Sequence, residues 1–240
     1  MKQNIRIFED PNQLADEAVK RLINYISEKR NEINIALSGG STPKIIYSKL
    51  AEVPSELINW TRIKLWWGDE RCVSPDDPAS NYGMAKNLLI DKIKIPPNNI
   101  YPIIGDNDPY NEVKRYSNLI EINVPKINQF PCFDVVILGL GEDGHTASIF
   151  PDQIDNFFSQ NYCEVTYHPE SNLPRITLTG NIINNANLIL FIATGENKTM
   201  IFDEVINNPK GNLQYPAALV KANHGQLEWY VDSKISLLLK

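Results

Sequence analysis

Two unbroken apolar runs constrain the fold of this chain more than any other feature of its sequence. Phe133–Leu138 contains four consecutive aliphatic residues, and Leu188–Ala193 consists of six apolar residues in succession. Short runs that do not alternate with polar residues are typical of strands that are buried on both faces of a parallel sheet. We therefore expect both runs to be central strands with helices packed above and below them.

The segments between and around these runs predict strands that alternate with helices. This alternation indicates an α/β fold with an open, mostly parallel sheet and helices on both faces. No Gly/Ser-rich linker or block of charge divides the chain, so we expect one domain over residues 1–240. The further strands are expected at Ile33–Leu37, Ile63–Trp67 and around Ile100–Ile104, and the helices from near Pro43, at Ser80–Ile90, at Tyr110–Ile122 and at Glu196–Asn207.

Charge and composition exclude several functional classes. With 23 basic and 29 acidic residues the net charge is −6, which argues against a basic surface for nucleic acid. A membrane-spanning helix needs roughly 18 apolar residues, and no run approaches that length. The N-terminal residues do not resemble a secretory signal. The three cysteines are widely spaced, at Cys72, Cys132 and Cys163, so we expect reduced thiols in a cytoplasmic protein. No third ligand is spaced near Asp76–Asp77, so we expect no metal site.

The first loop that could carry chemistry is Ser38–Pro43. It follows an expected strand, and its two glycines, Gly39 and Gly40, would let the backbone approach a ligand closely. Ser41 or Thr42 is expected to cap the helix that follows, whose N-terminus favours a phosphate. The same pattern fits a plain capped turn equally well.

The second loop, Gly68–Arg71, also follows an expected strand. Its acids and Arg71 could position and polarise a polar ligand. Taken alone, the pattern is more typical of a solvated loop with an arginine–carboxylate pair, with Ser80 as the cap of the next helix.

The third loop, Gly139–Pro151, carries the sharpest signal. Three glycines interleave with Glu142 and Asp143 and lead to His145, directly after the buried strand. A histidine at the carboxyl end of a parallel strand can accept a proton from water, and a neighbouring carboxylate can fix its tautomer. His168 and His224 are instead expected in turns or at the surface.

The last stretch supplies two cations. Arg175 opens an expected strand, and Lys198 falls in the first turn of an expected helix. The positive charge of a lysine is unfavourable beside the positive end of the helix dipole, and a bound anion would offset it. A solvent-facing lysine is the commoner case.

Together these motifs resemble one family, that of 6-phosphogluconolactonases within the glucosamine-6-phosphate isomerase/deaminase superfamily. The resemblance spans roughly residues 38–232 and depends on the order of its motifs. They are Ser38–Pro43, Asp69–Arg71, Ser80–Tyr82, Gly139–Pro151, Arg175–Thr179, Gly195 with Lys198, and the closing Pro216–Ala217 and Leu227–Asp232.

The resemblance implies a Rossmann-like sheet and hydrolysis of 6-phospho-D-glucono-1,5-lactone, a sugar-phosphate lactone, in the oxidative pentose phosphate pathway, without cofactor or metal. It implies that His145 is the base, oriented by Asp143 or Glu142, and that Arg71 binds substrate or stabilises negative charge. The candidates for holding phosphate and sugar are Gly39, Gly40, Ser41, Thr42, Asp69, Arg175 and Lys198.

Two other functions are alternatives to lactone hydrolysis. Related amino-sugar-phosphate deaminases use an acid soon after the loop histidine, whereas here no acid follows His145 before Asp152, and Arg71 follows the Asp-Glu pair. A non-catalytic sugar-phosphate sensor would need an effector domain, which we do not expect in this chain. The sequence does not predict an oligomeric state.

Overall fold

The computed structural model describes residues 4–207 and 214–238. Its strands and helices alternate along the chain, as the apolar pattern predicts. The strands are β1 (Asn4–Phe8), β2 (Ile33–Leu37), β3 (Ile63–Trp67), β4 (Asp69–Arg71), β5 (Ile100–Tyr101), β6 (Lys126–Ile127), β7 (Phe130–Pro131), β8 (Val135–Leu138), β9 (Cys163–Tyr167), β10 (Pro174–Leu178), β11 (Leu188–Ala193) and β12 (Gln226–Asp232). The helices are α1 (Pro11–Glu28), α2 (Ser41–Ala51), α3 (Asn81–Leu88), α4 (Pro109–Asn123), α5 (Asp155–Phe158), α6 (Gly180–Asn184), α7 (Thr199–Asn207) and α8 (Pro216–Leu219).

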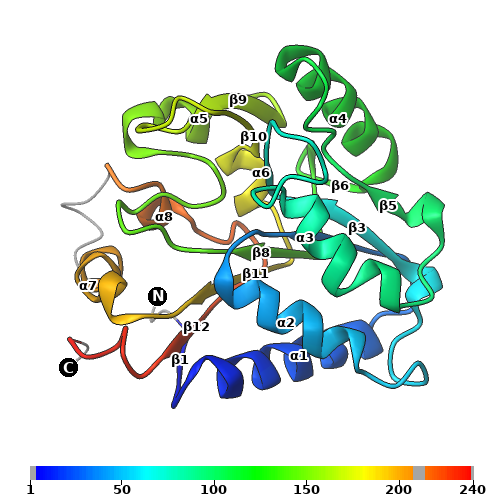
Figure 1. The fold of residues 1–240 in the computed structure, drawn as a ribbon, viewed down its shortest axis with the longest axis horizontal. Coiled ribbons are helices and arrows are strands. Elements are labelled where there is room, and N and C mark those ends of the chain that lie inside the picture. The colour runs from blue at the N-terminus through cyan, green and yellow to red at the C-terminus, as the bar shows by residue number, and fades with distance from the viewer. Residues whose placement is uncertain (1–3, 208–213, 239–240) are drawn as a thin grey trace.

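Seven strands form the central sheet in the order β1-β12-β11-β8-β2-β3-β5, and every neighbouring pair is parallel. Helices α1, α2 and α3 lie on one side of this sheet, and α4, α5 and α6 lie on the other (Figure 1). The arrangement confirms the expected open α/β fold with helices on both faces. Nearly all of the buried apolar side chains form one connected cluster. Among the described residues, no helix combines the length and the apolar composition needed to cross a membrane.

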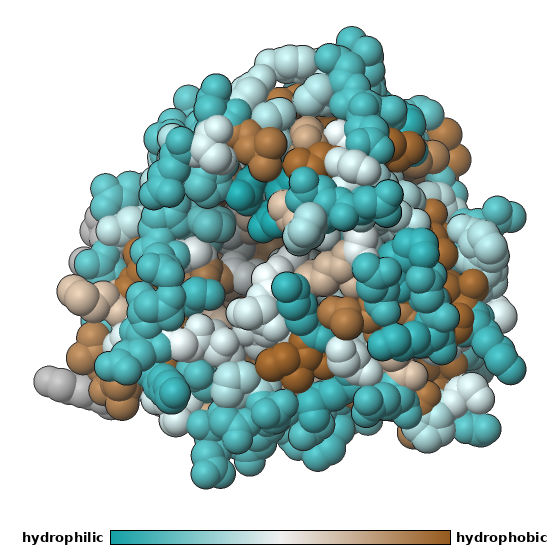
Figure 2. All heavy atoms as spheres, viewed as in Figure 1, coloured by the Kyte–Doolittle hydropathy of each residue, from teal (hydrophilic) through white to brown (hydrophobic). Residues whose placement is uncertain are grey.

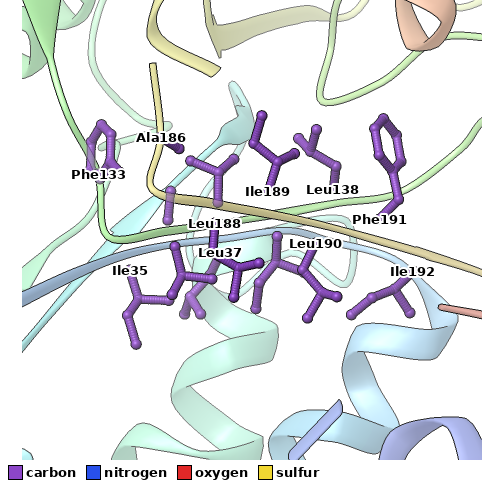
Figure 3. Close-up of a cluster of buried hydrophobic side chains, with 14 of the residues drawn as sticks. Ile35, Leu37, Phe133, Leu138, Ala186, Leu188, Ile189, Leu190, Phe191 and Ile192 are labelled. Carbon is purple, nitrogen blue, oxygen red and sulfur yellow. The ribbon is translucent and has the colours of Figure 1, made fainter. Parts of the chain in front are cut away.

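Strand β11 shows why the unbroken apolar run was informative. Ile189 and Phe191 point to one side of the sheet, and Leu190 and Ile192 point to the other (Figure 3). All four side chains are buried because both faces of the strand are covered. Phe191 also stacks on Trp229 of β12, with 3.8 Å between the ring centroids. A polar residue at any of these positions would leave its hydrogen-bonding groups without water.

The path of the chain reverses between β2 and β8, which are neighbours in the sheet. From β2 the chain continues to β3 on one side, and from β8 it continues to β11 on the other. The loops that leave the two carboxyl ends therefore diverge and leave a crevice between them, which is where open parallel sheets bind ligands. The loops at this point are Ser38–Gly40 and Gly139–His145.

A second, antiparallel sheet in the order β4-β10-β9 lies beside this crevice. The loop expected after Ile63–Trp67 is instead strand β4, which pairs Asp69 with Thr177 and Arg71 with Arg175. Its partner strand is about a hundred residues away along the chain, so the local sequence gives no sign of the pairing. The expectation of a solvated loop was wrong for this reason.

Several element ends differ from the expected ones. Helix α2 begins at Ser41 with Gly40 as its N-cap, so the expected cap by Ser41 or Thr42 was wrong. Both residues lie inside the first helical turn, and the Thr42 hydroxyl bonds to the hydroxyl of Thr194 at 2.8 Å. In contrast, Ser80 caps α3 as expected, because its Oγ accepts the Gly83 N–H at 3.0 Å.

Other expected segments also differ in their bounds. Strand β8 begins at Val135, two residues later than expected, and β5 ends at Tyr101. The helix expected over Glu196–Asn207 divides into a 3-10 turn over Glu196–Lys198 and helix α7.

We expect the replacement Ile189→Ala to lower the free energy of unfolding by about 2–5 kcal/mol, because it leaves a cavity in a strand covered on both faces. Denaturant unfolding measures this change. The matched variant is Ile122→Ala in α4, where the side chain is 69 % exposed. Its effect should stay within about 0.5 kcal/mol. Equal losses for the two variants would contradict the double coverage of β11.

Candidate active site

A cavity of about 160 Å³ opens at the crevice between β2 and β8. The surface is hollowed there, between the part of the molecule that carries β9 and β10 and the part that carries α2 (Figure 2). The structure brings seven of the ten predicted site residues to the wall of this cavity. They are Gly39, Gly40, Asp69, Arg71, His145, Arg175 and Lys198.

His145 is held by the carboxylate of Asp143. The Nδ1 atom lies 2.6 Å from Asp143 Oδ1, and the His145 N–H donates to the same oxygen at 3.1 Å. A carboxylate only accepts, so Nδ1 carries the proton and the Nε2 of a neutral imidazole is left as an acceptor. The Glu142 carboxylate instead accepts a hydrogen bond from the side-chain amide of Asn197. Of the two acids weighed from the sequence, the structure therefore places Asp143 beside His145.

The same contact affects the ionisation of Asp143. Burial would raise the pKa of this carboxyl, but the hydrogen bonds from His145 and the charge of its protonated imidazole outweigh burial and hold the pKa below its ordinary value. Asp143 consequently stays ionised in neutral solution. A charged acceptor is what fixes the tautomer that a general base needs.

The imidazole packs between a glycine and an aromatic ring. A Cβ added at Gly141 would lie 2.2 Å from Nδ1 of His145, so only glycine leaves room for the ring. On another side, Phe150 lies 4.8 Å from His145 between ring centroids. Ala147, farther along the loop, has a φ of 49°, an uncommon backbone conformation for a residue with a Cβ. Packing thus fixes the orientation of the ring, whereas the hydrogen bond to Asp143 fixes its tautomer.

Arg71 and Arg175 occupy directly opposed positions on β4 and β10. Their Nε atoms are buried and have no hydrogen-bond partner within the described part of the chain. Burial lowers the pKa of Arg175, and the positive charge of Arg71 lowers it further. Like charges directly opposite each other in a sheet are unfavourable. A bound anion between them would relieve the repulsion and satisfy the free donors.

Lys198 adds a third cation to the wall of the cavity. Burial lowers its pKa, and the charges of Glu142 and Asp232 counteract this effect. Asp232 also accepts the Gly195 N–H at 3.2 and 3.1 Å, which fixes the turn that carries the lysine. The three cations therefore reach one cavity from strands β4 and β10 and from the turn before α7.

The Ser38–Pro43 loop forms the wall near α2. A Cβ at Gly39 would lie 1.9 Å from Asn81 Oδ1, and Gly40 has a φ of 109°, so both positions favour glycine. Ser41 is exposed and Thr42 is buried, and neither side chain lines the cavity. What they contribute is the first turn of α2, whose N–H groups lack intrahelical acceptors.

Asp69 and Ser148 connect the cations to the interior. Ser148 Oγ donates to Asp69 Oδ2 at 2.7 Å and accepts from Arg175 Nη1 at 3.3 Å. Ser148 was not predicted as a site residue, although it lies within the Gly139–Pro151 motif. Asn81 was also missed, and its amide donates to the Asp69 carbonyl at 2.9 Å. No local pattern singles out either residue, because their partners are distant along the chain.

Glu70 lies between two residues of the cavity wall, Asp69 and Arg71, but its side chain bonds to the backbone of α3. It is buried and accepts hydrogen bonds from the N–H groups of Arg71, Asn81 and Tyr82 and from the Ser80 hydroxyl. Burial raises its pKa to about 7, although these backbone donors act in the opposite direction. Its carboxylate thus joins β4 to the N-terminus of α3 and does not face a ligand.

The remaining candidates for ligation lie elsewhere. His168 accepts backbone hydrogen bonds within a turn, and His224 is exposed, as expected. Within residues 4–207 and 214–238, no group of three or more His, Cys, Asp and Glu side chains is placed to hold a metal ion.

The fold and this cavity define an open-sheet α/β protein with a histidine–carboxylate pair and a cavity lined by three cations at the carboxyl ends of its strands. The family model described as glucosamine-6-phosphate isomerases/6-phosphogluconolactonase matches residues 9–229. The chain belongs to this family.

Individual relatives agree with this assignment. A protein of Haemophilus influenzae named 6-phosphogluconolactonase is 43 % identical over 226 residues, which cover 94 % of this chain and 95 % of that protein. The structure of 6-phosphogluconolactonase from Trypanosoma brucei matches with a TM-score of 0.91 and 27 % identity, over 100 % of this chain and 99 % of that one. A monomeric glucosamine-6-phosphate deaminase matches with a TM-score of 0.84 at 19 % identity, over 98 % and 100 % of the two chains, and so shares the fold.

We expect the replacement Asp143→Asn to weaken the preference of His145 for the Nδ1-protonated tautomer, because the amide of asparagine can also donate to the ring. The ¹⁵N chemical shifts of the neutral imidazole report this tautomer. The matched variant Glu142→Gln should leave these shifts unchanged, since Glu142 bonds to Asn197. A change in the second variant only would assign the orienting role to Glu142.

Proposed function

We infer that this chain is a 6-phosphogluconolactonase, which hydrolyses 6-phospho-D-glucono-1,5-lactone to 6-phospho-D-gluconate in the oxidative pentose phosphate pathway. The observation that carries this conclusion is that His145, with its Nε2 free, shares one cavity with three cations. A δ-lactone is an activated ester, so a base for water and stabilisation of the carbonyl oxygen suffice for its hydrolysis. We therefore expect the reaction to need no cofactor or metal.

In the proposed mechanism His145 Nε2 takes a proton from a water molecule while the water oxygen forms a bond to the lactone carbonyl carbon. The resulting negative charge on the carbonyl oxygen is stabilised by Arg71, whose Nε is unpaired. The bond from the carbonyl carbon to the ring oxygen then breaks. The imidazolium returns its proton to that oxygen, which becomes a hydroxyl group. Asp143 stabilises the imidazolium throughout.

We propose that the remaining residues hold the phosphate and the sugar. Arg175 and Lys198 supply charge for the phosphate. Gly39 and Gly40 let the ligand approach the first turn of α2, where Ser41 and Thr42 offer their backbone N–H groups. Asp69 is proposed to accept hydrogen bonds from sugar hydroxyls. Ser148 donates to Oδ2 of Asp69 at 2.7 Å, and Asn81 makes only a longer bond of 3.4 Å to Oδ1, so we propose that the sugar contact involves Oδ1.

Amino-sugar-phosphate deamination is the alternative that the shared fold keeps open. The residues after His145 argue against it, because Thr146, Ser148, Ile149 and Phe150 are buried and no acid follows before Asp152. A cytoplasmic location remains a prediction from the composition.

The direct test is a lactonase assay on freshly generated 6-phosphogluconolactone, with spontaneous opening subtracted. We expect the phosphorylated lactone to react much faster than gluconolactone, since otherwise the three cations would stay unpaired. Glucosamine-6-phosphate is the control substrate. Release of ammonia from it, without lactone hydrolysis, would contradict the proposed function.

We expect His145→Ala to lower kcat by about a hundredfold or more, the usual effect of losing a positioned base. His145→Gln should fail similarly, because an amide cannot take the proton from water. Substrate binding should survive in both variants, since the proposed phosphate contacts lie on other loops. His224→Gln, at an exposed position, is the matched control and should behave as the wild type. A folded His145→Ala variant with near-native kcat would make Asp69 the first candidate for the base.

The pH dependence should follow from the same role. We expect kcat to fall on the acid side, because only a neutral imidazole offers a free acceptor at Nε2. Rate measurements across this range in the wild type, after subtraction of the spontaneous reaction, test the expectation. An acid limb that persists in His145→Gln would belong to a different group.

We expect Lys198→Ala to raise KM roughly tenfold or more, with a smaller effect on kcat, if the lysine makes one charge-assisted contact with the phosphate. Steady-state kinetics on the phosphorylated lactone measure both constants. Lys44→Ala, at an exposed position of α2, is the matched control. An unchanged KM in the Lys198 variant would remove this residue from the proposed phosphate site.

A further inference from the structure

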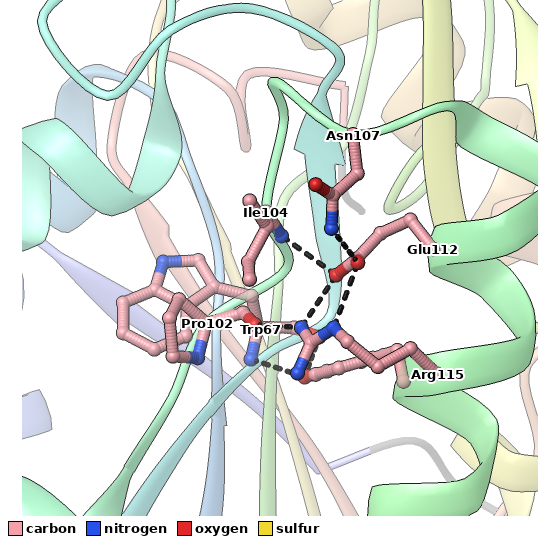
Figure 4. Close-up of polar contacts among 7 residues, drawn as sticks. Trp67, Pro102, Ile104, Asn107, Glu112 and Arg115 are labelled. Carbon is pink, nitrogen blue, oxygen red and sulfur yellow. Dashed lines mark hydrogen bonds and ion pairs between the residues drawn. The ribbon is translucent and has the colours of Figure 1, made fainter.

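Helix α4 carries a buried carboxylate that the proposed chemistry does not use. Glu112 is 0 % exposed and accepts four hydrogen bonds (Figure 4). The donors are the Ile104 N–H at 2.7 Å, Asn107 Nδ2 at 2.8 Å, and Nε and Nη2 of Arg115 at 2.7 and 2.5 Å. Arg115 also donates to the Pro102 carbonyl at 2.8 Å. This network fixes the loop of residues 102–107 on α4, because a buried charge is tolerated only when its donors stay in place.

Inside this loop, Gly105 lies against the backbone that carries Arg71. A Cβ added at Gly105 would lie 2.1 Å from the carbonyl oxygen of Val73 and 2.8 Å from that of Arg71. The Val73 N–H donates to the Arg71 carbonyl at 2.8 Å, so these residues form a tight turn. Only glycine allows the loop to approach this turn so closely.

The same helix also holds the start of this segment. The Tyr116 hydroxyl donates to the Trp67 carbonyl at 2.9 Å and accepts the Trp67 N–H at 2.8 Å. Trp67 is the last residue of β3, immediately before Gly68 and β4. Helix α4 therefore fixes the backbone on both sides of Asp69–Arg71, from outside the cavity.

Arg71 needs such support because it lies opposite another arginine and its buried Nε has no hydrogen-bond partner among the described residues. Its side chain faces the cavity opposite Arg175, and its described hydrogen bond runs from Nη1 to the Ala79 carbonyl at 2.6 Å. Repulsion between the two guanidinium groups would favour a displaced backbone if the surrounding structure allowed one.

We propose that Gly105 and Glu112 are positioning residues for Arg71, which hold its backbone so that the guanidinium converges with Arg175 on the ligand. The loop 102–107 acts as a wedge between α4 and the Arg71–Val73 turn. This role rests on the proposed function, in which Arg71 contacts the substrate. Neither Gly105 nor Glu112 touches the cavity itself.

The experiment compares two glycine replacements. Gly105→Ala should lower kcat/KM for the phosphorylated lactone about tenfold or more, because small displacements of a charged group at a site are costly. Gly225→Ala is the matched control, since its Cβ would lie 2.3 Å from the Ala186 carbonyl oxygen, at the amino ends of β11 and β12. It should lower the thermal unfolding temperature comparably and leave kcat/KM within about threefold of the wild type.

A double-mutant cycle with Arg71→Ala separates positioning from general destabilisation. If Gly105 acts through Arg71, then Gly105→Ala should cost less than about threefold in kcat/KM once Arg71 is absent. Losses that multiply fully in the double variant would overturn the proposal. So would a Gly105→Ala enzyme with wild-type kcat/KM.

A second pair of variants keeps the test decisive if Gly105→Ala does not fold. Glu112→Gln retains the shape of the side chain but offers one acceptor oxygen in place of two, so we expect a several-fold loss of kcat/KM that again disappears in the Arg71→Ala background. Glu228→Gln is its control, because Glu228 is also buried and ion-paired, with Arg21 at 2.9 Å near the opposite edge of the sheet. Equal losses of activity in the two glutamine variants would contradict a specific role of Glu112.

Failure of the proposed function can be told apart from failure of this inference. A folded wild-type protein without lactonase activity would contradict the function. The same variants would then be compared by calorimetric binding of 6-phosphogluconate, whose phosphate and carboxylate are the anions the cations would bind. Weaker binding in Gly105→Ala than in Gly225→Ala supports the positioning role, and equal binding overturns it.

Discussion

The pairing of β2 with β8 is the contact on which the site depends. Only two residue pairs join these strands, Ile35 with Val135 and Ala36 with Val136. Yet this pairing brings together two glycine-containing loops that are about a hundred residues apart in sequence. Because the chain leaves the two strands in opposite directions, the loops diverge and leave room for a ligand. The central strands, which are buried on both faces, thus fix the place where the loops diverge and the cavity forms.

Around the crevice, the fold brings several positive charges close together, and their mutual repulsion destabilises the folded protein. Arg71 and Arg175 are forced into opposed positions by the register of β4 and β10. Asp69 moderates this repulsion through the Ser148 hydroxyl, without forming a direct ion pair that would block the guanidinium groups. The network around Glu112, on the far side of the same segment, provides the rigidity that such an arrangement requires.

Neighbouring acids in this protein have different roles because they accept hydrogen bonds from different donors. Asp143 accepts from the imidazole of His145, whereas Glu142, one residue earlier, accepts from Asn197. Asp69 accepts from Ser148 beside the cavity, whereas Glu70 accepts from the N–H groups at the start of α3. Adjacent residues of a strand point to opposite faces, which separates the second pair. The geometry of the loop separates the first.

The sequence by itself determined the central strands, the α/β class and the loops that carry chemistry. Apolar periodicity reflects local burial, and glycine, histidine and capping residues have local conformational requirements. Only the tertiary structure decided that Asp69–Arg71 forms a strand, that Asp143 rather than Glu142 contacts His145, and that Ser148, Asn81 and Gly105 support the site. These features depend on partners far apart in the chain, such as Thr177 for Asp69 and Val73 for Gly105, and no local pattern encodes such distances.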